Sequence, residues 1–107
     1  MGNTVIIDFG TLEGPVFTGR PRGEQLRVKL HVDSYDEQNV EVEVNIPDST
    51  YSISSSFILG LFGKSVVKAG SKDAFYNKFH FNTNELFHEV IDSCVSRALQ
   101  DKDIFTN

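Results

Sequence analysis

Three consecutive serines, at positions 54–56, are the residues of this chain with the clearest chemical potential. A strand-like stretch precedes them, and an apolar helical pattern follows through Ile58, Leu61 and Phe62. The first turn of a helix has unpaired backbone N–H groups and a partial positive charge. A serine there can cap the helix, or it can carry a phosphate that those groups would stabilise. The residues alone leave both alternatives open.

A serine can also act as an enzyme's nucleophile when a histidine and an acid lie beside it. The chain has three histidines, His31, His80 and His88. It has no Gly-x-Ser-x-Gly elbow and no glycine-rich nucleotide motif. We therefore expect a protein without enzymatic activity or cofactor, and a small hydrolase is the weakest alternative. We expect His80 to point outward from a strand and His88 to lie at the surface of a helix.

The composition is that of a globular protein, with 107 residues, of which 39% are hydrophobic, and a net charge of −5. This length predicts one domain over residues 1–107, with a fraying tail at 101–107. An acidic chain without a dense basic face disfavours binding to nucleic acid or to an anionic membrane. Cys94 is the only cysteine and no leader sequence is visible, so we expect a cytoplasmic protein without a disulfide or zinc cluster.

Four stretches have the composition of strands. Residues 40–46 alternate valine or isoleucine with polar side chains, which is the clearest strand signal in the chain. Residues 4–9 are β-branched and apolar, residues 15–17 suggest a second short strand, and residues 79–81 a last one.

Three stretches have helical spacing, and two between them are less regular. We predict helices over 18–30, from Ser54 or Ser55 to 69, and from a cap at Asn82 to about residue 100. Residues 31–39 read as a polar loop, and residues 71–78 as a short helix or turn. In the last helix, Cys94 lies within a broad apolar stripe and should be a buried thiol.

This order of strands and helices predicts an α/β fold. We expect a mixed sheet of about four strands, with helices mainly on one face. Gly60 and Gly63 lie inside a predicted helix, where glycine costs stability, so that helix should pack closely on a sheet or partner. Gly70 is a suitable C-terminal cap.

The only concentration of basic residues lies in the first predicted helix and comprises Arg20, Arg22, Arg27 and Lys29. It is either the solvated flank of a helix or a docking patch for an acidic partner or a phosphate.

Three segments together resemble the STAS-like family of small bacterial proteins, which is related to the anti-sigma-factor antagonists. They are residues 17–24 before a helix, the alternating strand that leads into Ser-Ser-Ser-Phe, and residues 79–81 followed by the terminal helix. The resemblance covers most of the chain, and it implies a small STAS-like sandwich and a role in signalling regulation by partner switching.

In the antagonists the corresponding turn reads Asp-Ser-Ser-Gly, and a kinase of the histidine-kinase-like ATPase fold phosphorylates its first serine. Ser54 stands at the aspartate, Ser55 at the phosphorylated serine, Ser56 at the next serine and Phe57 at the glycine. The resemblance therefore implies that Ser55 is the first candidate for phosphorylation, before Ser54 and Ser56. The phosphate would control binding to a histidine-kinase-like ATPase or an anti-sigma factor.

The partner-binding surface predicted from these arguments includes six residues: Ser54, Ser56, Phe57, Leu59, Arg20 and Arg22. Phe57 is either a hydrophobic anchor for the partner or an ordinary core residue. The alternative to a switch is a structural or oligomerisation domain, monomeric or weakly dimeric through a strand edge or the last helix.

Overall fold

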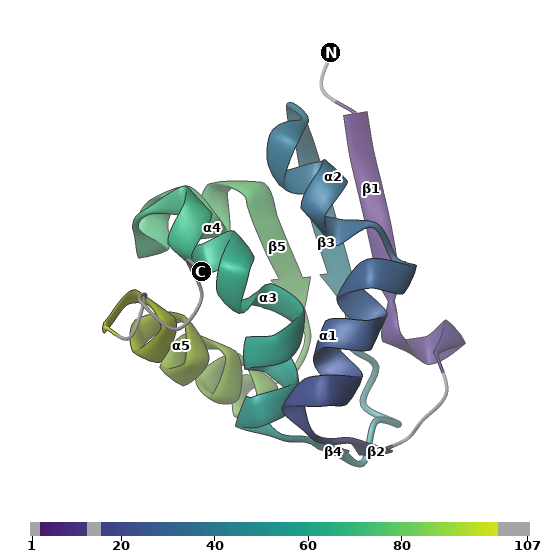
Figure 1. The fold of residues 1–107 in the computed structure, drawn as a ribbon. Coiled ribbons are helices and arrows are strands. Elements are labelled where there is room, and N and C mark those ends of the chain that lie inside the picture. The colour runs from purple at the N-terminus through teal and green to yellow at the C-terminus, as the bar shows by residue number, and fades with distance from the viewer. Residues whose placement is uncertain (1–2, 13–15, 101–107) are drawn as a thin grey trace.

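The computed structural model describes residues 3–12 and 16–100. The strands are β1 (Asn3–Asp8), β2 (Val16–Phe17), β3 (Val40–Asn45), β4 (Ser52–Ile53) and β5 (Phe79–Asn82). The helices are η1 (Phe9–Thr11), α1 (Arg20–Lys29), α2 (Val32–Glu37), α3 (Ser55–Ala69), α4 (Lys72–Lys78) and α5 (Glu85–Gln100) (Figure 1). The expected fraying tail and Pro15 lie outside the described residues.

The described strands form two small sheets. Strands β1, β3 and β5 pair in the order β1-β3-β5, with Ile7 opposite Val44 and Val44 opposite Phe81. Strands β2 and β4 form a separate pair. The α/β class is confirmed, but the described strands do not form the expected single mixed sheet of about four strands, because they make two sheets and every pairing is parallel. Helices connect successive strands of the larger sheet and return the chain to the same end, which produces parallel pairing.

Helices cover one face of the three-stranded sheet, as expected. Val42, Val44 and Phe79 point into the core and are almost completely buried. The opposite face carries polar side chains such as Glu41, with one apolar exception, Ile6, which is 63% exposed.

The core contains two groups of phenylalanine rings. Phe9, Phe17 and Phe57 form one group, with ring centroids 5.0 Å apart between Phe9 and Phe17 and 5.4 Å between Phe17 and Phe57. The second group surrounds Phe62 beneath the sheet, where its centroid lies 5.6 Å from that of Phe79. Phe17 belongs to β2 and Phe57 to the first turn of α3, so the first group packs next to the serine turn.

Helices α1 and α3 cross at two glycines. A Cβ atom at Gly60 would clash with the backbone oxygen of Arg20, and one at Gly23 would clash with that of Phe57. The predicted close packing at Gly60 is therefore confirmed, but the neighbour is helix α1 and not a sheet or a partner. This contact brings the first turns of α1 and α3 side by side at one end of the molecule (Figure 1).

Two features predicted from the sequence, a loop and a helix cap, are wrong. Residues 31–39 were expected to form a loop, but they contain α2, which begins after His31 in a left-handed conformation with φ of 60°. Asn82 belongs to β5, and Asn84 caps α5 instead, since its side-chain oxygen accepts a hydrogen bond of 2.9 Å from the Phe87 N–H. Gly70 at the C-cap of α3, with φ of 90°, agrees with prediction.

Within the described residues, no helix combines the length and apolarity needed to cross a membrane.

Candidate functional site

Ser54 is the N-cap of α3 and joins the beginnings of two helices. Its hydroxyl oxygen accepts hydrogen bonds of 3.2 Å from the Phe57 N–H and of 3.2 Å from the Gly19 N–H. Its own N–H donates to the backbone oxygen of Phe17 at 2.9 Å. Gly19 precedes α1 with φ of 88° and offers no side chain as a cap. The Ser54 side chain therefore has a structural role at the junction of α1 and α3.

Ser55 and Ser56 occupy the first two positions of α3 and are both exposed. Their backbone N–H groups are among the first four of the helix, which have no carbonyl acceptor within the helix. No acidic residue lies in the first turn of α3 or of α1, so no carboxylate offsets the positive ends of these two helix dipoles. We call the group of Gly19, Arg20, Ser54, Ser55 and Ser56 the paired helix start. It combines accessible hydroxyls with a local field that favours negative charge.

The structure places the two predicted arginines on different sides of α1. Arg20 faces α3, and its guanidinium lies 3.4 Å from the Glu24 carboxylate. Arg22 faces β2, where its guanidinium donates to the backbone oxygen of Val16 at 2.6 Å and lies 5.2 Å from the centre of the Phe17 ring. Arg20 therefore belongs to the paired helix start, and Arg22 does not.

Phe57 does not belong to a partner surface in this structure, and Leu59 contributes only a small exposed area to one. The side chain of Phe57 is fully buried between the rings of Phe9 and Phe17, and Leu59 is only 8% exposed. The interpretation of Phe57 as an anchor for a partner is therefore corrected, and the core alternative applies. The cause is the helical period, since positions 57, 58, 61 and 62 turn toward the core while 55 and 56 face outward.

A groove of about 290 Å³ runs between α1 and α3 beside the paired helix start. Arg20, Glu24, Leu59, Gly60 and Lys64 all line it. Where the helices cross, Gly60 lets the two backbones touch, and charged side chains line the groove beside this crossing. Arg20 and Lys64 give the groove cationic groups, beside the acidic Glu24.

The sequence interpretation missed a partly buried ionic network at this groove, which Arg27 and Asp33 also line. The guanidinium of Arg27 donates to Asp36 at 2.6 Å, to Asp33 at 2.8 Å and to the Ser65 hydroxyl at 2.8 Å. Arg27 is only 4% exposed, so it is not part of an accessible basic patch. This network joins α1, α2 and α3. The only sequence signal for it is a buried position in α3 occupied by Ser65, which is not distinctive.

Cys94 lies on α5 beneath the serine turn. Its sulfur is 3.6 Å from the backbone oxygen of Ser55, and the residue is 3% exposed. Burial raises the pKa of the thiol above its ordinary value, which keeps it protonated and unreactive. The prediction of a buried cysteine is confirmed.

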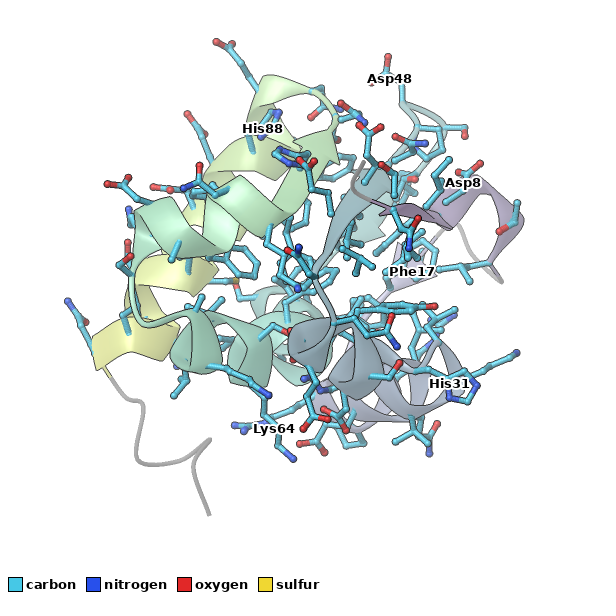
Figure 2. All side chains as sticks on the ribbon, turned by 90° about the horizontal axis from the view of Figure 1, so that it is seen from above. Asp8, Phe17, His31, Asp48, Lys64 and His88 are labelled. Carbon is cyan, nitrogen blue, oxygen red and sulfur yellow. The ribbon has the colours of Figure 1, made fainter. Side chains whose placement is uncertain are left out.

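The histidines are distributed over separate elements. His31 precedes α2 and His88 lies on α5, well apart in Figure 2. His80 is on the open face of the sheet, as predicted, with its Nε2 2.7 Å from a carboxylate oxygen of Glu41. In the part of the chain that the structure describes, no three His, Cys, Asp or Glu side chains are grouped as metal ligands.

The chain matches no protein-family model, no curated protein and no solved structure. The STAS-like resemblance therefore remains a prediction from the sequence motifs, and the function rests on the geometry of the site.

Proposed function

We propose that this protein is a regulatory module that binds a partner protein through the paired helix start and is switched by phosphorylation of Ser55. The observation that carries the proposal is that the three serines have different structural roles. Ser54 supplies the cap, while Ser55 and Ser56 stay exposed in a first turn that contains no acid.

The fold can accept a phosphate at Ser55 without rearrangement. A phosphoserine adds a charge of about −1.5 to −2, and a helix N-terminus stabilises such a charge by about 0.3–1 kcal/mol. The hydroxyl of Ser55 forms none of the capping bonds, which belong to Ser54. The charge would instead change the surface that meets the partner, through repulsion or through a new arginine contact.

The groove between α1 and α3 gives the partner a place to bind. Lys64 and Arg20, whose guanidinium also contacts Glu24, favour acidic groups of the partner. A phosphate on Ser55, one helical turn before Leu59 in α3, would oppose those groups. A change of about 3 kcal/mol in binding free energy corresponds to more than a hundredfold in affinity, which is enough for a switch. A histidine-kinase-like ATPase or an anti-sigma factor is the proposed partner. Because phosphorylation of Ser55 by such a kinase uses ATP, we propose that the switch operates in the cytoplasm.

The test is incubation with ATP and the histidine-kinase-like ATPase encoded nearest to this protein in its genome, followed by site mapping by mass spectrometry. We expect a phosphate at Ser55 of the wild type and no phosphorylation of Ser55→Ala. The control Ser93→Ala, which removes an exposed serine from the middle of α5, should be phosphorylated like the wild type.

The affinity of the same partner should then differ between the unmodified and the phosphorylated protein by about a hundredfold. Arg20→Ala should weaken binding of the unmodified form. The proposal is refuted if the kinase modifies an established substrate under the same conditions and leaves Ser55 unmodified.

A further inference from the structure

Strand β1 is an edge of the three-stranded sheet, and its outer side pairs with no other described strand (Figure 1). An edge strand presents a row of backbone N–H and C=O groups that can pair with a strand of another chain. Proteins usually block such edges with lysine, proline, bulges or a covering element.

Strand β1 has none of these protective features among its side chains. Its sequence, Asn-Thr-Val-Ile-Ile-Asp, contains no lysine, arginine or proline, and its single charge lies at the end, at Asp8. Ile6 is 63% exposed in the centre of the strand, on the open face of the sheet. By contrast the other edge strand, β5, is shorter and carries polar side chains on this face, at His80 and Asn82.

We propose that β1 pairs antiparallel with β1 of a second copy, which joins two three-stranded sheets into one of six strands. A two-fold axis perpendicular to the sheet keeps both open faces on the same side. In that arrangement even-numbered residues of β1 must oppose even-numbered residues of the second copy. With the axis at Ile6, the two Ile6 side chains pack against each other, Val5 opposes Ile7, and Thr4 opposes Asp8.

The residues of β1 fit a second copy because the strand itself adds little repulsion to the contact. Each chain carries a net charge of −5, which opposes self-association through surfaces rich in carboxylates. In the proposed register no two carboxylates of β1 oppose each other, because each Asp8 meets a threonine. The two β3 strands, which carry Glu41 and Glu43, would lie three strand spacings apart, about 14 Å. This exceeds the screening length of about 8 Å at physiological salt.

The test is sedimentation velocity over a wide range of concentration. We expect a reversible dimer in the wild type. Ile6→Lys places two ammonium groups opposite each other and removes the Ile6 contact, so it should weaken the dimer at least about tenfold. Leu86→Lys is the matched control, because Leu86 is 64% exposed on α5, and it should leave the dimer unchanged.

A charge exchange separates the proposed register from a general effect of lysine. Ile6→Glu should also dissociate the dimer, whereas an equimolar mixture of Ile6→Lys and Ile6→Glu should form a heterodimer. Amide hydrogen exchange in β1 should slow as the wild-type concentration rises. A monomer at all concentrations, or a dimer that Ile6→Lys leaves intact, overturns the proposal. These measurements need neither kinase nor phosphate, so they are independent of the proposed switch.

Discussion

Asp33 and Asp36 bind the same guanidinium group but should differ greatly in their importance for stability. Their carboxylates lie 2.7 Å and 2.6 Å from Nη2 of Arg27. The side chain of Asp36 is 5% exposed and that of Asp33 is 73% exposed. Water and salt screen the exposed pair, while the buried pair exists only because each charge compensates the other.

Asp36→Asn leaves the guanidinium of Arg27 buried without its buried counter-charge. The loss of one partner from a buried pair costs about 3–5 kcal/mol, and because Asp33 still contacts Arg27 we expect the lower end, about 3 kcal/mol. Asp33→Asn should cost at most about 1 kcal/mol. A loss of 1 kcal/mol lowers the melting temperature of a domain of this size by about 4 °C. The melting temperature should therefore fall by about 12 °C in Asp36→Asn and by less than about 4 °C in Asp33→Asn.

Urea denaturation followed by circular dichroism measures both free energies of unfolding. The double variant Arg27→Met with Asp36→Leu is a further control, because an apolar pair of similar volume should recover much of the stability that Asp36→Asn loses. Equal losses in Asp33→Asn and Asp36→Asn would show that burial does not set the strength of this network.

Two other predictions concern the serine caps and one carboxylate. Ser54→Ala should lower the free energy of unfolding by about 2 kcal/mol, because two backbone N–H donors lose their acceptor. Ser71→Ala, which removes one such hydrogen bond at α4, should lower it by about 1 kcal/mol. Equal losses would show that the bond to Gly19 contributes nothing. The hydrogen bond from Lys72 lowers the pKa of Asp92, so its contribution is present above the ordinary carboxyl pKa and disappears as pH falls through the folded-state value. Because Asp92 is half exposed, Asp92→Asn should cost only about 0.5 kcal/mol at neutral pH, and denaturation in strong acid should show no difference from wild type.

Local patterns predicted the elements whose signal lies within a few residues. The alternation in residues 40–46 gave β3, and the apolar spacing between the serines and Gly70 gave α3 with its caps. In both cases the information is contained in the period of the side chains and in the chemistry of the terminal residue. The same reasoning failed for α2, a helix of only six residues that is held in place by the contact of Asp36 with Arg27.

The candidate site was predicted in part. The sequence suggested the serine turn and Arg20, and the structure places them together. It also suggested Phe57 and Arg22 as contacts for a partner, but Phe57 is in the core and the Arg22 side chain packs against β2. Position in the sequence does not show which side of a helix meets its neighbour, because that depends on the crossing of α1 and α3.

The sequence by itself determined the α/β class, the serine turn at the beginning of a helix and the burial of Cys94, since each follows from spacing along one segment. The tertiary structure decided that the described strands pair in parallel, that Arg27 is buried and that the first turns of two helices lie together. These features depend on contacts between residues far apart in the chain, such as Ser54 with Gly19 and Arg27 with Ser65. Such contacts require that α1 and α3 lie as close as the glycine crossing allows, with their backbones touching.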